Sequence, residues 1–125
     1  MAQKRTVTKI NILGTDYTVT KKKYSDDPYF EKHSVEGYCA EYMKAIVYCD
    51  ASTLPGWESI TPMERESSEK ETLRHEIVHA FFNESGLSSS SASIDGPWAK
   101  HEEMVDWFAI QGPKIYEAWR AAEAL

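Results

Sequence analysis

The sequence has few cysteines and no long apolar segment. Cys39 and Cys49 are its two cysteines, and they do not form a Cys-x-x-Cys pair, so a thiolate zinc site is not expected. No stretch approaches the roughly 20 consecutive apolar residues that a membrane helix needs, and residues 1–6 lack the apolar core of a secretion signal. We therefore expect a cytoplasmic protein with no membrane partner. Its cysteines should be reduced and packed, although they could also face each other across a hairpin.

Basic residues are in the minority. The chain has 14 Lys and Arg against 20 Asp and Glu, which gives a formal net charge of −6. Its one basic cluster, Lys21-Lys22-Lys23, is better explained as a solvated strand end, so nucleic acid is not an expected partner. The 125 residues, 42% of them hydrophobic, are enough for one core, and we expect residues 1–125 to form a single domain.

The first half of the chain has patterns typical of strands. Alternating apolar and β-branched residues, separated by turn signals such as Gly14-Thr15-Asp16, predict two hairpins. The first would pair residues 7–13 with 17–20, and the second would pair 37–41 with 44–50. Residues 45–49 are the most apolar of these segments and should run inside the sheet or along a covered edge. The expected fold is therefore α+β, with a small antiparallel, twisted sheet of two hairpins in a β-rich part spanning 6–50.

A long helix is expected over about residues 62–86. Thr61 fits the N-cap, Pro62 the first helical position and Glu64 the third. Gly86 fits the C-terminal end, where a left-handed backbone conformation often stops a helix.

The C-terminal part is predicted to be a loop followed by helices. Residues 87–96 are small and polar, which favours a Ser-rich surface loop. Helices are expected over 97–125, with Val105 and Ala109 facing inward and with Gly112-Pro113 breaking or kinking the helical run.

The expected long helix contains the pattern His75-Glu76-x-x-His79. In a helix, residues four apart lie about one turn apart on the same side, so the two imidazoles can converge on one point. Two neutral imidazoles suit Zn²⁺, and Glu76 lies where it can reach a metal-activated water without being a ligand. The alternative is a core helix in which the two histidines simply pack.

A third metal ligand must come from elsewhere. The extended pattern HExxHxxGxxH is absent, because Phe82 and Ser85 occupy its later positions. The other known arrangement takes a carboxylate from a following helix, since catalytic zinc usually has three protein ligands and one open position.

The segment from His101 to Asp106 offers that carboxylate. We prefer Glu102, which shares a helix side with inward-facing residues, and Glu103 is the alternative; His101 is a poorer third choice. Asp106, one turn after Glu102, is placed to accept a hydrogen bond from the far nitrogen of a ligand histidine.

With these residues the chain resembles a minimal gluzincin, and more narrowly the small phage and prophage proteins of the ImmA/IrrE-like metallopeptidase group. The resemblance covers the order of the predicted elements and most of the chain, but only the HExxH pattern is highly specific. It implies a short twisted sheet packed on the HExxH helix, with zinc in the cleft between them. The matching segments are 75–81, 84–87, 102–107 and 113–115.

The resemblance implies hydrolysis of peptide bonds. His75, His79 and Glu102 would hold zinc, and Glu76 would act as the general base on the activated water. The substrate would be a peptide or protein, and a phage-encoded protein of this kind would act in the host cytoplasm. The alternative is a catalytically silent, zinc-binding phage accessory or regulatory protein that binds a protein partner. The sequence does not indicate an oligomeric state.

Overall fold

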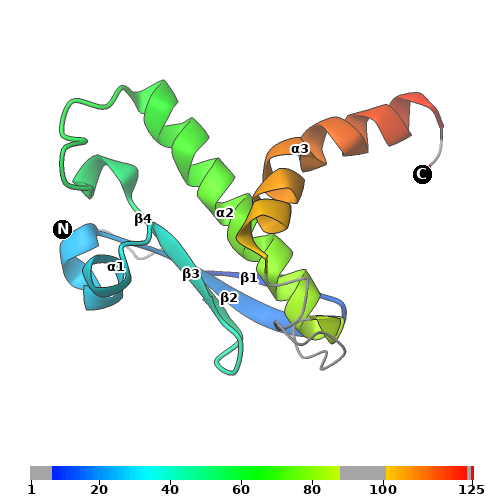
Figure 1. Cartoon of the computed structure of the whole chain (residues 1–125), viewed down its shortest axis with the longest axis horizontal. Helices are drawn as coiled ribbons and strands as arrows, with labels where there is room; N and C mark the ends of the chain where they lie inside the picture. Colours follow the sequence, from blue (N-terminus) through cyan, green and yellow to red (C-terminus); the bar gives the residue numbers. More distant parts are fainter. Residues whose placement is uncertain (1–6, 88–100, 124) are drawn as a thin grey trace.

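Two long helices and a four-stranded sheet form the described part of the protein. The structure is a computed structural model that describes residues 7–87, 101–123 and 125. Helix α2 crosses one face of the sheet, and α3 packs against α2 and extends away from the sheet (Figure 1). In chain order the elements are β1 (Val7–Ile12), β2 (Thr15–Lys22), the 3₁₀ turn η1 (Tyr24–Asp26), α1 (Pro28–His33), β3 (Gly37–Ala40), β4 (Ala45–Cys49), the 3₁₀ turn η2 (Ala51–Thr53), α2 (Pro62–Glu84) and α3 (Glu102–Ala121).

Strands β1 and β2 form the first predicted hairpin. Its turn consists of Leu13 and Gly14, both with positive φ, because Ile12 pairs directly with Thr15. Two central residues with positive φ match the right-handed twist of the flanking strands. The Asn11 side chain accepts a hydrogen bond from the Gly14 backbone N–H and holds the turn closed. The turn therefore begins one residue earlier than predicted, and Thr15 already belongs to β2.

The sheet is mixed, so the prediction of an antiparallel sheet was wrong in one pairing. Both hairpins form, but the strand order is β1-β2-β4-β3 and β2 runs parallel to β4. After β2 the chain passes through η1 and α1 and then forms the second hairpin, β3 and β4. Of these two strands, β4 lies next to β2. This places the most apolar strand in the interior, as predicted for residues 45–49, and leaves β3 at an edge.

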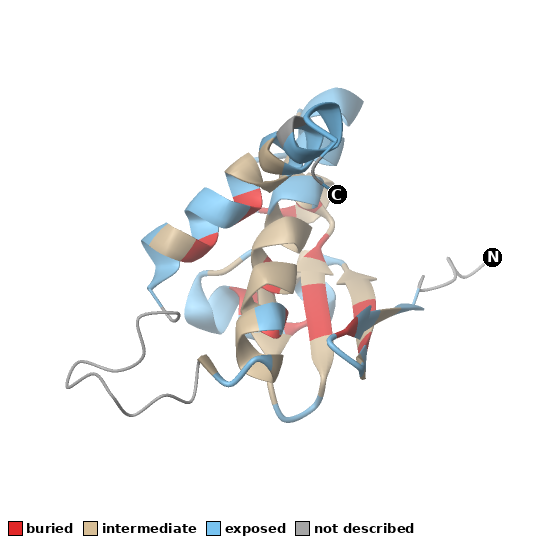
Figure 2. Ribbon diagram, turned by 90° about the vertical axis from the view of Figure 1, so that its right-hand side faces the viewer, coloured by how far each residue is buried: buried red, intermediate tan, exposed pale blue. Residues whose placement is uncertain are grey.

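The two faces of β4 bury different apolar clusters. Ile46 packs with Ile12, Tyr17, Val19 and Ala80 under α2. On the opposite face a second cluster contains Phe30, Val47, Cys49, Ala51 and Leu54. Buried segments therefore run through the middle of the sheet (Figure 2). The burial of both faces explains why β4 is nearly continuously apolar.

Helix α2 begins and ends where the sequence predicts. The Thr61 hydroxyl oxygen accepts a hydrogen bond from the Glu64 backbone N–H at 3.2 Å, and Pro62 is the first helical residue. At the other end Ser85 caps the helix, and Gly86 follows with a φ of 83°. These caps satisfy backbone groups that would otherwise lack partners at the two ends of the helix. They therefore define where the helix that contains His75 and His79 begins and ends.

Helix α3 continues through Pro113, so of the two predicted outcomes, a break or a kink at Gly112-Pro113, the break does not occur. Proline lacks an N–H and therefore leaves the carbonyl four residues earlier, that of Ala109, without its helical partner. The Arg74 side chain donates a hydrogen bond from Nε to this carbonyl at 2.7 Å. Residues 88–100, which include most of the predicted Ser-rich loop and the predicted start of this helix, lie outside the described residues.

The C-terminal end of α2 is attached to the sheet through Glu84. Its carboxylate accepts hydrogen bonds from Tyr17 Oη at 2.6 Å, Thr15 Oγ1 at 3.0 Å and Lys44 Nζ at 2.7 Å. The Lys44 ammonium and the Tyr17 hydroxyl lower the pKa of Glu84 to about 2. Among the described residues, no helix has the length and apolar character needed to span a bilayer.

Replacing Arg74 by Met should leave the Ala109 carbonyl without a donor. We expect the free energy of unfolding to fall by about 1.5–3 kcal/mol, the usual loss for a hydrogen bond to a charged group. Guanidinium unfolding followed by circular dichroism, with EDTA present to exclude metal binding, measures the change. In a Pro113→Ala background the helix supplies its own N–H, so Arg74→Met should cost less there. An equal cost in both backgrounds would contradict this role of Arg74.

Acid should weaken the attachment made by Glu84. Its pKa is lower in the folded protein than the ordinary value of about 4.3 in an unfolded chain. The ionised carboxylate therefore stabilises the fold above about pH 4.3, and this stabilisation is lost as pH falls toward 2. Wild type should be more stable than Glu84→Gln at pH 6, and the difference should shrink steadily in unfolding measurements down to pH 2. Glu123→Gln, which changes an exposed residue, is the control; a difference independent of pH would refute the prediction.

Candidate metal centre

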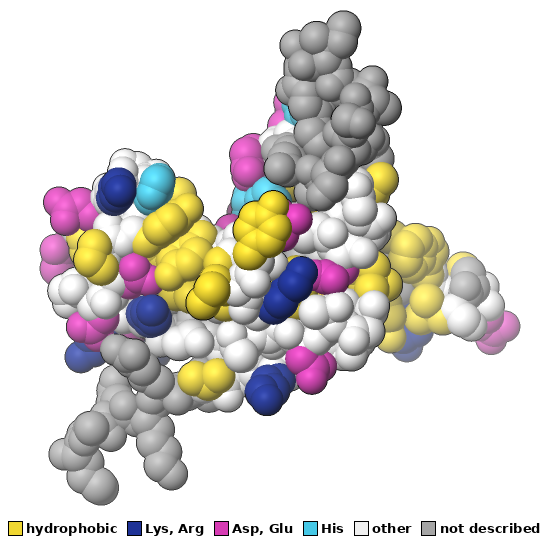
Figure 3. Space-filling view, turned by 90° about the horizontal axis from the view of Figure 1, so that it is seen from below, with side chains coloured by type: hydrophobic (Ala, Val, Ile, Leu, Met, Phe, Trp, Pro, Cys, Tyr) yellow, Lys and Arg dark blue, Asp and Glu magenta, His cyan; other side chains and the backbone are white. Residues whose placement is uncertain are grey.

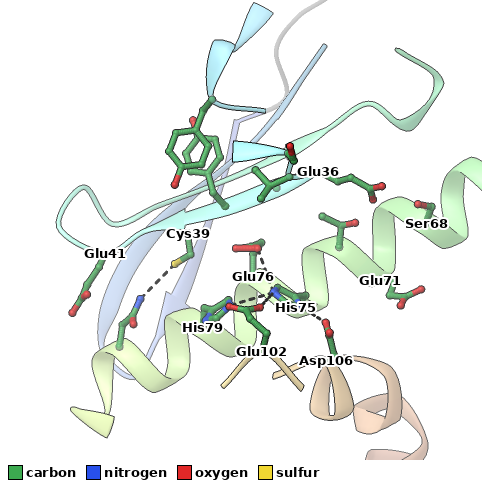
Figure 4. A pocket seen from close by; sticks show the side chains of 17 residues that line it. Glu36, Cys39, Glu41, Ser68, Glu71, His75, Glu76, His79, Glu102 and Asp106 are labelled. Atoms are coloured by element: carbon green, nitrogen blue, oxygen red, sulfur yellow. Dashed lines mark hydrogen bonds and ion pairs between the residues drawn. The ribbon is translucent and has the colours of Figure 1, made fainter. Parts of the chain in front are cut away.

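His75 and His79 lie one turn apart on α2 and converge, as the HExxH spacing predicts. Their Nε2 atoms are 3.1 Å apart, and both side chains are about one-fifth exposed. The rings meet edge to face, with centroids 4.8 Å apart. Both rings therefore direct one nitrogen toward the same point at the side of α2 (Figure 4).

Helix α3 brings carboxylates to this point. One oxygen of Glu102 lies 3.0 Å from His75 Nε2, and the other lies 3.3 Å from His79 Nε2. Asp106, one turn later, lies 2.6 Å from His75 Nδ1. The preferred carboxylate and its predicted supporting residue thus both contact the histidines. The alternatives Glu103 and His101 are exposed, and neither side chain has a hydrogen bond or ion pair within the described part of the chain.

The protonation pattern leaves several acceptors facing one another. An ionised carboxylate only accepts hydrogen bonds, so His75 Nδ1 must carry the proton that Asp106 accepts. In a neutral ring His75 Nε2 is then an acceptor, and it faces the Glu102 carboxylate and His79 Nε2. A neutral His79 can carry its proton on Nε2 and donate it to one of these acceptors, or it can carry the proton on Nδ1, in which case all three groups present lone pairs to the same point and a cation would be attracted there. Four ligands at zinc-like bond lengths of about 2.0–2.1 Å would be about 3.3 Å apart, so this donor set fits a metal ion.

Glu76 lies beside these ligands but deeper in the protein. It is 5% exposed, and its Oε1 is 3.7 Å from His75 Nε2, beyond hydrogen-bonding distance. His75, Glu76 and His79 together can hold a metal ion, with ligand atoms within 4.8 Å of one another. The Glu102 carboxylate is nevertheless better placed as the third ligand, because its oxygens come closer and reach both histidines.

Burial governs the ionisation of both inner groups. It raises the pKa of Glu76 to about 7, with smaller contributions from the charges of Glu102 and Asp106, while His75 acts in the opposite direction. Burial also lowers the pKa of His79, although the Glu102 carboxylate opposes this effect. The neutral imidazole that a metal requires is therefore favoured at His79. A bound dication would lower the pKa of Glu76, because a positive charge favours the carboxylate.

Gly37 lets the edge strand β3 approach α2 closely next to Glu76. A Cβ atom at Gly37 would lie 2.8 Å from Thr72 Cγ2, 3.1 Å from the Val47 carbonyl oxygen and 3.5 Å from Glu76 Cγ. The first two distances are shorter than ordinary contacts, so a larger residue would require the Thr72 side chain to move and would press on the Val47 carbonyl of β4. Glycine here keeps Glu76 beside the backbone of β3.

A groove of about 820 Å³ runs between β3 and α2 and contains the candidate site. His75, Glu76, His79, Glu102 and Asp106 line its middle, and Cys39 lies toward one end (Figure 4), where its sulfur accepts a hydrogen bond from Asn83. On the surface, histidine and acidic side chains gather at a hollow beside apolar side chains (Figure 3). The metal-binding atoms are therefore reachable from solvent along one side of the sheet.

Sequence reasoning did not identify Arg74 and Gly37. Arg74 precedes the first histidine, and only its contact with the Ala109 carbonyl on α3 reveals what it does. The proline inside an apolar helical pattern was the available signal, because it implies an unpaired carbonyl four residues earlier. Gly37 appeared in the sequence only as the start of a strand.

Comparisons with known proteins do not assign the chain to a family. No protein-family model matches it, and neither curated proteins nor solved structures give a significant match. The resemblance to gluzincins therefore stays a prediction, and the functional argument depends on the geometry of the site.

Proposed function

We propose that this protein is a zinc-dependent peptidase. The observation that carries the proposal is the convergence of His75 Nε2, His79 Nε2 and the Glu102 carboxylate, with the buried Glu76 beside them and an open groove in front. Two imidazoles and one carboxylate form a donor set used by catalytic zinc in peptidases.

In this proposal α2 and α3 share the task of holding the metal. His75 and His79 would supply neutral nitrogens, and Glu102 would supply the negative charge. Asp106 keeps the Nδ1 proton on His75, so that Nε2 stays free to bind. When bound, zinc would supply Lewis acidity, which polarises a peptide carbonyl and makes water nucleophilic near neutral pH.

Glu76 is the proposed general base. Its carboxylate would accept a proton from the attacking water and later deliver it to the leaving amine, so one group serves both transfers. No described side chain donates a hydrogen bond to it, which leaves its oxygens free to exchange a proton. Its position against Gly37 keeps it near the groove floor.

The open edge of β3 supplies the proposed place for the substrate. The order β1-β2-β4-β3 leaves one side of β3 without a strand partner in the described sheet, and that side borders the groove. An extended peptide can pair with such an edge through backbone hydrogen bonds, which positions a peptide bond without requiring particular side chains.

Metal content tests the first half of the proposal. Wild type purified without a His tag should contain close to one zinc per chain by mass spectrometry. His79→Ala should contain little, since two ligands bind far more weakly than three. Glu102→Gln should bind zinc at least tenfold more weakly, whereas the neighbouring control Glu103→Gln should bind like wild type. No metal in wild type, even after zinc is offered, would mean that the histidines simply pack against each other.

Replacing Glu76 by Gln tests the second half. The variant keeps the shape of the side chain but cannot accept a proton, so it should bind zinc normally and lose at least 100-fold in kcat against a peptide library. Unchanged turnover would remove Glu76 from the role of base. Zinc bound by both proteins with no cleavage by either would favour the alternative of a silent, zinc-binding regulatory protein.

A further inference from the structure

The charged side chains that line the groove are acidic. Among the described residues, its lining contains six carboxylates and neither lysine nor arginine. Three of the six, Glu76, Glu102 and Asp106, belong to the candidate metal centre. The other three, Glu36, Glu41 and Glu71, have no part in holding the metal in the arrangement described above.

These three carboxylates lie on both sides of the centre. Glu36 immediately precedes β3 and Glu41 immediately follows it, so they flank the edge strand. Glu71 is one helical turn before His75 on α2. Figure 4 shows Glu36 and Glu71 on one side of Glu76 and Glu41 on the other. A peptide that follows the groove would therefore meet negative charge before and after the reacting bond.

Within the part of the chain that the structure describes, no ion pair neutralises their charges. None of the three has a Lys or Arg partner within 4.0 Å among the described residues, whereas Glu69 and Glu84 are paired with Lys21 and Lys44. A second feature of the groove also indicates a ligand: the Glu76 side chain is 93% buried, lines the same space, and receives no hydrogen bond from any described residue. Together they describe a prepared site that attracts positive charge.

We infer that the groove selects extended peptide segments that carry lysine or arginine on both sides of the cleaved bond. The inference rests on the proposed function, because it names the substrate class of that same site. Strand pairing with β3 supplies affinity that is independent of sequence, and the flanking carboxylates supply the selection. Glu36 and Glu41 bracket the four residues of β3, which span about 13 Å at about 3.3 Å per residue, so basic residues on either side of a paired segment of similar length would meet them.

Matched peptides test the selection. One cleaved peptide from the library is remade with its basic residues changed to Gln and then to Glu, and kcat/KM is compared at low and high salt. Wild type should prefer the basic peptide at least tenfold at low salt, and the preference should shrink at high salt because exposed charges are screened. Equal cleavage of the basic and Gln peptides would overturn the inference.

A matched pair of variants assigns the preference to the groove. The triple variant Glu36→Gln, Glu41→Gln, Glu71→Gln should lose roughly tenfold in kcat/KM on the basic peptide and little on the Gln peptide, since exposed ion pairs are individually weak. The control Asp16→Asn, Glu31→Gln, Glu123→Gln makes the same change in net charge at exposed positions outside the groove, and it should behave like wild type. Equal losses in both triple variants would mean that overall charge, not the groove, attracts the peptide.

Binding separates this inference from the proposed function. Zinc-loaded Glu76→Gln protein is titrated with a fluorescent, extended peptide of Lys and Ala, and with a Gln and Ala peptide, by anisotropy. Tight binding of the Lys peptide, lost in the groove variant, supports the inference even if no peptide is cleaved. Cleavage without a preference for basic peptides supports the peptidase and rejects the inference. Failure of the Lys peptide to bind better than the Gln peptide also rejects it.

Discussion

The packing of α3 on α2 is the contact on which the candidate site depends. The histidines lie on α2, whereas Glu102 and Asp106 come from α3, so small shifts between the helices would separate them. Val105 and Ala109 are buried at this contact, one helical turn apart, and Arg74 closes it with a hydrogen bond to the Ala109 carbonyl. Pro113 creates that free carbonyl, so a residue that weakens α3 locally also provides the acceptor that attaches α3 beside His75.

A second constraint lies on the other side of α2. Gly37 allows β3 to approach so closely that a Cβ atom would collide with Thr72, and Glu76 lies against the same glycine. The short distance between the edge strand and Glu76 is therefore possible because residue 37 has no side chain, which leaves room for the Thr72 and Glu76 side chains of α2. Together with the contact to α3, this places α2 between its two neighbours, with Glu102 and Asp106 reaching His75 from the α3 side and Glu76 lying against β3 on the other.

Local signals allowed the sequence to predict much of this arrangement. The cap at Thr61, the helix end just before Gly86, the spacing of His75 and His79, and the apolar strand β4 depend on residues close together in the chain, and each was confirmed. The parallel pairing of β2 with β4 and the continuity of α3 through Pro113 depend on distant partners. The parallel pairing places β4 where both of its faces are buried, and the Arg74 side chain supplies the hydrogen bond that Pro113 removes from α3. Both effects involve residues far apart in the chain, so local propensity does not predict them.

The negative charges of the site come from different elements, since Glu76 lies on α2 whereas Glu102 and Asp106 lie on α3. Glu76, Glu102 and Asp106 all lie around His75, and the charges of the last two, together with burial, make it harder to ionise Glu76. Like charges this close are unfavourable unless positive charge lies among them. A dication between the histidines and Glu102 would remove this repulsion, and the unpaired Glu36, Glu41 and Glu71 would still leave the groove negative. One charge distribution can thus favour both a metal at the centre and a basic chain along the edge strand.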